Sequence, residues 1–212
     1  MAEFAALEKK IVAFLKRRIE TMGVDAGGLY NYYQQLANQD RAFASYDVPV
    51  ANFILQKAKG FANYIEAGAG LGQLVAILAA NGLTTVGVES DSRRFHAMCD
   101  LFAELPEATS ARAVEGLFPN AVQSMISPST LVIFTCFNSG GTEEYEAAML
   151  AGVAAAGGLV MDLARFCYLK HKPEELDELA RRVEALGFLP AEEVHSWNAV
   201  PQGRVVYFRR SA

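Results

Sequence analysis

The strongest constraint on the fold is a regular alternation of short apolar runs with segments of helical periodicity, which begins near residue 62. The apolar runs lie at residues 62–68, 84–90, 111–116, 130–137 and 157–164. Helical patterns fall between or after them, at residues 73–81, 93–105, 120–125 and 173–186. Parallel strands need connections long enough to return over the sheet, and helices supply them. The sequence therefore predicts a doubly wound α/β fold with a mostly parallel sheet.

Two further runs follow, at residues 191–197 and 204–210, separated by the short stretch NAVPQG. This stretch is rich in turn formers and too short for a parallel crossover, so it predicts a hairpin. We expect a seven-stranded sheet whose last strand runs antiparallel to the others.

The first 60 residues do not follow the alternation and are predicted to be helical. Residues 1–20 carry apolar side chains at helical spacing, namely Phe4, Leu7, Ile11, Phe14, Leu15 and Ile19. Residues 29–44 form a second helical pattern rich in tyrosine and glutamine, and Asp47 and Pro49 suit the start of a third helix. We expect residues 1–47 to form a helical cap within the same domain as a core at residues 48–212.

Composition and charge disfavour several classes of protein. A chain of 212 residues that is 52% apolar can bury one sizeable core, and its net charge of -5 is spread along the chain, which disfavours a nucleic-acid partner. The first 20 residues carry charges every few positions, so they fit neither a signal peptide nor a membrane span. Cys99, Cys136 and Cys167 are far apart, as in reduced packing positions of a cytoplasmic protein, and no metal site follows from them. The oligomeric state is not encoded in any of these features.

Three glycines lie between the first apolar run and the helical pattern that follows it, in YIEAGAGLGQL. Ligands of open α/β sheets bind outside the carboxyl ends of the strands. A turn without side chains lets a ligand approach the backbone and the positive end of the next helix. We interpret Gly68, Gly70 and Gly72 as part of a nucleotide site; the alternative is that they only tighten the turn.

The spacing of these glycines separates two nucleotide classes. A dinucleotide fingerprint needs glycine or alanine at position 73, where Gln73 stands, so a nicotinamide-dependent oxidoreductase is disfavoured. Glu66 precedes the glycines, and Glu89 ends the second apolar run about 20 residues further on. A carboxylate at that point can accept both hydroxyls of a ribose.

The stretches IEAGAGLGQLVAILAANG and VGVES resemble the first two motifs of the class I S-adenosylmethionine-dependent methyltransferases, and the order of elements resembles that family from about residue 61 onward. The resemblance implies S-adenosyl-L-methionine as the cofactor. It implies that Glu66 anchors the glycine loop near the methionine part, that the glycines contact the cofactor, and that Glu89 holds the ribose. Where many members place an acid beside the adenine, Leu117 is interpreted as an apolar contact to the ring or, alternatively, as a core leucine.

The resemblance also implies where the methyl acceptor lies. Methyl transfer in this family is an in-line displacement, so the protein supplies proximity, alignment and a dry pocket. Asn138 occupies the position that addresses the acceptor; alternatively it belongs to a turn before a helix capped by Thr142. His171 follows the fifth run and can accept a proton from a hydroxyl acceptor, or else is a solvated loop histidine. Asp162 lies at the same edge, without a partner set that would indicate a magnesium site.

Tyr30, Tyr33 and Tyr46 lie in the N-terminal segment, which often forms a lid over the cofactor in this family. Their rings can contact the substrate and exclude water, or they can pack the cap on the sheet. The sequence thus predicts methyl transfer to a small molecule with an N or O nucleophile. The alternative is a non-catalytic subunit of the same fold that binds a cofactor or a partner protein, and an NAD(P)-dependent oxidoreductase is less favoured.

Overall fold

The computed structural model describes residues 4–21, 28–137, 141–197 and 203–211. Its α-helices are α1 (Ala5–Thr21), α2 (Gly28–Asn38), α3 (Asp47–Lys57), α4 (Gln73–Ala80), α5 (Ser92–Glu104), α6 (Glu143–Gly152) and α7 (Pro173–Ala185). Its strands are β1 (Asn63–Ala67), β2 (Thr85–Glu89), β3 (Ala111–Glu115), β4 (Thr130–Phe134), β5 (Gly158–Asp162), β6 (Phe188–Trp197) and β7 (Gly203–Arg210). None of the described helices is both long and apolar enough to cross a membrane.

The strands form one seven-stranded sheet in the order β3-β2-β1-β4-β5-β7-β6. Strands β1 to β5 pair in parallel, whereas β7 runs antiparallel to both β5 and β6. The predicted doubly wound fold and the antiparallel last strand are therefore confirmed. The strand order reverses between β1 and β4, and ligands of such sheets bind at this switch point, outside the carboxyl ends of the strands.

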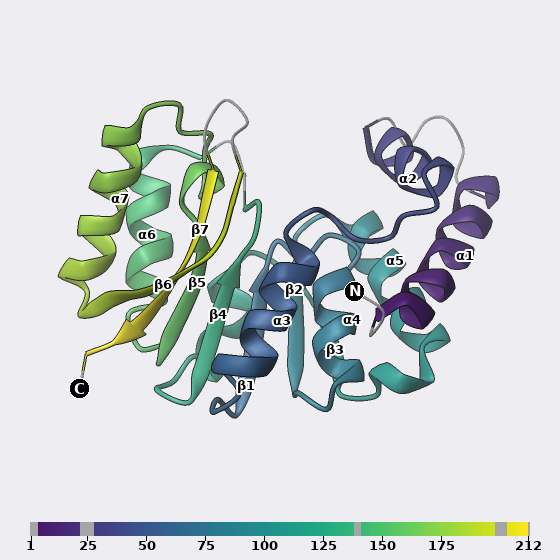
Figure 1. The fold of residues 1–212 in the computed structure, drawn as a ribbon, viewed down its shortest axis with the longest axis horizontal. Coiled ribbons are helices and arrows are strands. Elements are labelled where there is room, and N and C mark those ends of the chain that lie inside the picture. The colour runs from purple at the N-terminus through teal and green to yellow at the C-terminus, as the bar shows by residue number, and fades with distance from the viewer. Residues whose placement is uncertain (1–3, 22–27, 138–140, 198–202, 212) are drawn as a thin grey trace.

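Alternate strand residues supply a hydrophobic core on each face of the sheet. Tyr64 and Ile133 belong to the core that also contains α1, α3 and α4, whereas Ile65 and Phe134 pack on the opposite face with α6 and α7. Figure 1 shows α1 and α2 at the end of the molecule opposite α6 and α7. Because side chains alternate along a strand, Glu66 points to the same face as Tyr64, which is the face that carries the cap.

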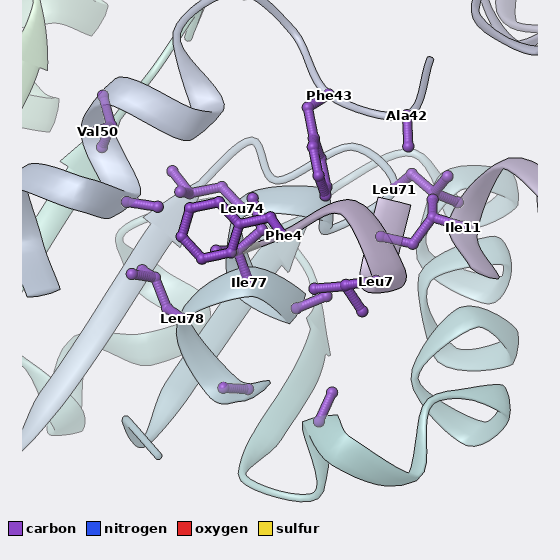
Figure 2. Packing of buried hydrophobic residues seen from close by; sticks show 14 of the residues in the cluster. Phe4, Leu7, Ile11, Ala42, Phe43, Val50, Leu71, Leu74, Ile77 and Leu78 are labelled. Atoms are coloured by element: carbon purple, nitrogen blue, oxygen red, sulfur yellow. The ribbon is translucent and has the colours of Figure 1, made fainter. Parts of the chain in front are cut away.

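The cap is joined to the core by apolar packing. Figure 2 shows Phe4, directly before α1, beside Leu74 and Ile77 of α4, and it shows Ile11 of α1 beside Leu71; all five side chains are buried. Burial of side chains of this size stabilises the fold by about 1.5–3 kcal/mol each. The apolar side predicted for residues 1–20 is therefore the side that holds α1 on the core.

The tyrosine-rich helix is shorter than its sequence pattern predicts. It ends at Asn38, and Asp40 adopts a left-handed backbone conformation (φ 49°), which a continuing helix does not allow. Residues 39–46 then pass beside the start of α4, where the Gln73 Nε2 atom donates a hydrogen bond to Ala42 O at 3.2 Å. The end of α2 thus brings a non-helical part of the cap next to the glycine turn.

Other boundaries also differ from the expectations. Asn120–Met125 is a 3-10 helix rather than an α-helix, and β6 begins three residues before the expected position 191. The sequence indicates α6 only through Thr142, whose Oγ1 atom accepts the Tyr145 N–H at 3.3 Å as an N-cap. The 3-10 helix is a difference of helix type over the expected range, whereas the start of β6 lies at an element end, where boundaries are least fixed by sequence.

Candidate functional site

Glu89 ties the end of β2 to the glycine turn that follows β1. Its Oε2 atom accepts the Gly70 N–H at 2.9 Å, and its Oε1 atom accepts the Ser90 and Asp91 N–H groups at 2.8 and 2.9 Å. Glu89 is buried, and hydrogen bonds to a carboxylate are worth about 1.5–3 kcal/mol each. This side chain therefore holds the loop in the path on which a ligand would rest.

The three glycines of the turn have different neighbours. All have positive φ, from 59° to 78°, a conformation that favours glycine. A Cβ atom on Gly68 would lie 2.9 Å from the Phe137 ring, and one on Gly72 would lie 2.7 Å from the Phe102 ring. A Cβ atom on Gly70 would meet nothing within 4 Å. Gly68 and Gly72 thus permit close packing, whereas Gly70 leaves its backbone open to a ligand.

Glu66 lies on β1 directly before the turn and is only 5% exposed. Its Oε1 atom accepts a hydrogen bond from Thr135 Oγ1 at 2.8 Å, and its Oε2 atom has no hydrogen-bond partner in the described part of the chain. Burial, and next the nearby Asp47 carboxylate, raises the pKa of Glu66 well above its ordinary value. A buried carboxylate with an unfilled acceptor atom suits a ligand that brings N–H donors or positive charge.

A cavity of about 250 Å³, which we call the cap cavity, lies between the cap and the glycine turn. Its lining includes Glu66 and Gly70 from the sheet side and Tyr33, Tyr46 and Asp47 from the N-terminal segment. Two of the three tyrosines predicted to contact substrate therefore lie at the cavity. Their elements are brought there by the early end of α2.

Asp47 is the site residue that the sequence did not reveal. It is the first residue of α3, it is 5% exposed, and its Oδ2 atom accepts the Ala44 N–H at 2.7 Å. Burial raises the pKa of Asp47 from 3.8 to about 7. An acidic residue at the start of a helix is ordinarily explained by its favourable interaction with the helix dipole. The local sequence therefore gives no sign that Asp47 belongs to a ligand site.

A second cavity, of about 330 Å³, is named here the Leu117 cavity. Its walls include Ser90, Leu117 and Phe137, and Gly68 lines both this cavity and the cap cavity. Leu117 is 61% exposed, so its interpretation as a core leucine is wrong. The two cavities therefore meet at Gly68 of the glycine turn.

The ends of β4 and β5 bring Cys136 and Asp162 to the same edge of the sheet. Cys136 lines the cap cavity, is exposed and has a left-handed backbone (φ 56°), so its prediction as a packing residue is wrong. Burial raises the pKa of Asp162 to about 6, and the charge of Arg165 opposes this shift. Although the residue is exposed overall, desolvation of the Cys136 thiol among its neighbours raises the pKa of the thiol. Cys136 and Asp162 therefore place polar groups at the carboxyl ends of β4 and β5.

Some predicted residues are not brought to this site. His171 is exposed, its N–H donates to Glu175 Oε2 at 2.8 Å at the start of α7, and it lines neither of the two cavities. That position matches the alternative of a solvated loop histidine. Asn138 lies outside the described residues, and so does the side chain of Tyr30, although its backbone belongs to α2.

A buried ion-pair network supports the loop after β5. Lys170 is 2% exposed and donates to Glu146 Oε2 at 2.6 Å and to Phe166 O at 2.8 Å. Arg182 also pairs with Glu146, through its other carboxylate oxygen. The network joins α6, the loop after β5 and α7, so it supports the β4 and β5 end of the sheet edge.

No protein-family model and no curated protein matches the sequence. Among solved structures, a TehB-like SAM-dependent methyltransferase from Corynebacterium glutamicum matches with a TM-score of 0.63 and 18% identity, over 86% of this chain and 98% of that one. Magnesium protoporphyrin IX methyltransferase from Synechocystis, solved with bound SAM, matches with a TM-score of 0.64 and 16% identity, over 93% and 90%. A precorrin-6y C5,15-methyltransferase from Geobacter metallireducens matches with a TM-score of 0.56 and 13% identity, over 80% and 94%. The chain therefore has the Rossmann-like fold of the class I methyltransferases.

Proposed function

We propose that the protein transfers the methyl group of S-adenosylmethionine to an N or O nucleophile of a small molecule. The observation that carries this proposal is the hydrogen bond from the Gly70 N–H to Glu89, which joins the expected ribose acid to the open glycine of the turn. Magnesium protoporphyrin IX methyltransferase, which has the same fold, was solved with this cofactor bound. That agreement of fold supports the same cofactor here.

In the proposed arrangement the cofactor lies across the glycine turn. The cap cavity with Glu66 would hold its methionine part, Glu89 between the two cavities would accept its ribose hydroxyls, and the Leu117 cavity would hold its adenine. When bound, the cofactor supplies a methyl group already activated on a sulfonium. The residues of this chain align the acceptor and exclude water, which can lower the barrier by about 7–11 kcal/mol in well-oriented cases.

The proposed acceptor approaches from the side of β4 and β5. Tyr33 and Tyr46 offer aromatic walls to it, and Asn138 is proposed to orient its nucleophile. The acidic net charge supports a small acceptor over a nucleic acid. A proposed RNA methyltransferase from Pyrococcus horikoshii has the same fold, so RNA is the competing acceptor class.

Titration calorimetry with S-adenosylmethionine and S-adenosylhomocysteine tests the cofactor. We expect both to bind the folded protein, and binding of neither would reject the proposal. Enhanced fluorescence of NADH or NADPH on mixing with the protein would favour an oxidoreductase instead.

Transfer of a labelled methyl group tests the acceptor class. Small-molecule extracts and RNA are offered separately, and we expect label to appear in the small-molecule fraction. Label in RNA alone would overturn the proposed acceptor class. Absence of turnover with any acceptor, despite cofactor binding, would favour the non-catalytic subunit.

A further inference from the structure

Two buried carboxylates line the cap cavity, and neither is ion-paired with a cation of the described residues. Asp47 and Glu66, named here the carboxylate pair, are each 5% exposed and both line the cavity. Neither forms an ion pair with a lysine or arginine in the described part of the chain. Arg94 also lines the cavity, but its side chain is exposed and not paired with them.

Such an arrangement is unfavourable in the free protein, because two buried like charges repel each other and each has lost hydration. Local hydrogen bonds compensate the lost hydration of the two carboxylates only in part. The Ala44 N–H serves one oxygen of Asp47, and Thr135 serves one oxygen of Glu66, while the Glu66 Oε2 atom has no partner among the described residues. Burial raises the pKa of Asp47 to about 7 and that of Glu66 well above its ordinary value, so the pair retains protons near neutral pH.

A positively charged ligand group with several N–H donors would donate hydrogen bonds to both carboxylates and would also neutralise their charge. The methionine part of S-adenosylmethionine carries such a group, the α-ammonium, whereas its sulfonium has no N–H to donate. We propose that Asp47 and Glu66 together bind this α-ammonium group and that the pair releases a proton to solvent when the cation binds. The proposal rests on the proposed function and adds to it a residue of the cap, Asp47, as a determinant of cofactor affinity.

The other ionisable groups around the carboxylate pair do not supply the positive charge that the ammonium group would bring. Glu89 accepts three backbone N–H groups of the turn region, and the Cys136 thiol is held neutral by the burial that raises its pKa. The titratable and charged groups that face the pair from other elements are Tyr33, Tyr46, Glu89, Arg94 and Cys136. Protons compete with the ligand for the pair, so cofactor affinity should weaken as pH falls below about 7.

The first experiment compares two ligands and two variants at pH 7.5. Asp47→Asn keeps an oxygen for the Ala44 N–H but removes the charge, and Asp40→Asn removes an exposed carboxylate that lines neither cavity. S-adenosylhomocysteine retains the α-ammonium, whereas methylthioadenosine lacks it. We expect Asp47→Asn to weaken S-adenosylhomocysteine by about tenfold or more, and methylthioadenosine by less than about twofold. Asp40→Asn should change neither.

The second experiment counts protons by calorimetry in two buffers of different ionisation enthalpy. At pH 6.5 a free α-amino group, with a pKa of about 7.7–8.0, is already charged and takes up little. We expect the wild type to release about half to one proton per S-adenosylhomocysteine bound. Asp47→Asn should release much less, and so should the wild type with methylthioadenosine.

Stability without ligand shows whether Asp47 titrates as the proposal requires. Asp47 binds its proton more tightly in the folded protein, with a pKa of about 7, than at its ordinary value of 3.8. The folded state therefore holds more protons between these values, and this contribution to stability is lost as pH rises through them. We expect the denaturation midpoint of the wild type to fall more from pH 5 to pH 8 than that of Asp47→Asn.

The outcomes separate the two proposals. Binding of neither S-adenosylmethionine nor S-adenosylhomocysteine by the wild type would remove the proposed function and this inference with it. Equal S-adenosylhomocysteine affinity and equal proton release in the wild type and Asp47→Asn would overturn the carboxylate pair alone. An equal loss of affinity for both ligands in Asp47→Asn would overturn it too, because that loss would not involve the ammonium.

Discussion

The two halves of the carboxyl edge of the sheet are held in place by different means. At β1 and β2, Glu89 accepts three backbone N–H groups, all from the glycine turn or from the residues directly after β2. At β4 and β5, the loop contacts depend on side chains from other elements, with Lys170 and Arg182 both paired to Glu146. The first half is built from local backbone geometry and the second from distant side chains, which explains why only the first carries a readable motif.

The loops of the second half also contain strained backbone. Cys136 and Cys167 have positive φ, 56° and 61°, and the Cys167 N–H donates to Phe137 O at 2.6 Å, which links the two loops. A residue with a Cβ in the left-handed region costs about 1–2 kcal/mol. The surrounding packing and the buried ion pairs must therefore outweigh that strain, and damage to them should affect the β4 and β5 half first.

The largest effect is expected when the buried network loses its carboxylate. Glu146→Ala leaves Lys170 buried without a counter-charge, so we expect the free energy of unfolding to fall by about 3–5 kcal/mol. Denaturant titration measures it. Glu143→Ala, at an exposed position in the first turn of the same helix, should change stability by less than about 0.5 kcal/mol. A loss below about 1 kcal/mol in Glu146→Ala would mean that the network does not hold this half.

Next in size is the contrast between two glycines of the turn. Gly72→Ala combines a left-handed backbone (φ 78°) with a Cβ atom 2.7 Å from Phe102, so we expect a loss of about 2–4 kcal/mol in unfolding free energy. Gly70→Ala adds a Cβ atom in open space and should cost only the backbone strain, about 1–2 kcal/mol. Gly70→Ala should nevertheless weaken the cofactor, because its Cβ occupies the space left for the ligand. Equal stability losses in the two variants would contradict the different roles assigned to them.

The smallest expected effect separates cofactor binding from chemistry. Glu89→Ala removes the proposed acceptor of two ribose hydroxyls and also the acceptor of three backbone N–H groups at the turn. We expect it to weaken S-adenosylmethionine by at least about tenfold, or about 1.4 kcal/mol. Asn138→Ala should keep cofactor affinity within a few fold while methyl transfer falls, because it is assigned to the acceptor. Calorimetry measures the cofactor affinity of both variants and requires no knowledge of the substrate. An unchanged affinity in Glu89→Ala would break the assignment of the β2 end, and a large loss in Asn138→Ala would move that residue to the cofactor side.

The features that follow from the sequence are those set by local spacing. The α/β class follows from apolar runs that alternate with helical periods, and the antiparallel last strand follows from a connection too short for a crossover. Three glycines with a carboxylate before them, and Glu89 at the end of the next strand, predict the position of the turn. The structure shows each of these features in place, because backbone conformation and strand length depend mainly on neighbouring residues.

Only the tertiary structure decided which distant side chains meet at that turn. Asp47 reaches Glu66 because α2 ends at Asn38 and residues 39–46 pass beside α4, a path that the tyrosine-rich pattern did not predict. Leu117 is an exposed cavity wall rather than a core residue, and His171 is exposed at the start of α7. Burial and charge environment arise from packing between elements far apart in the chain, and no local pattern of residues encodes that packing.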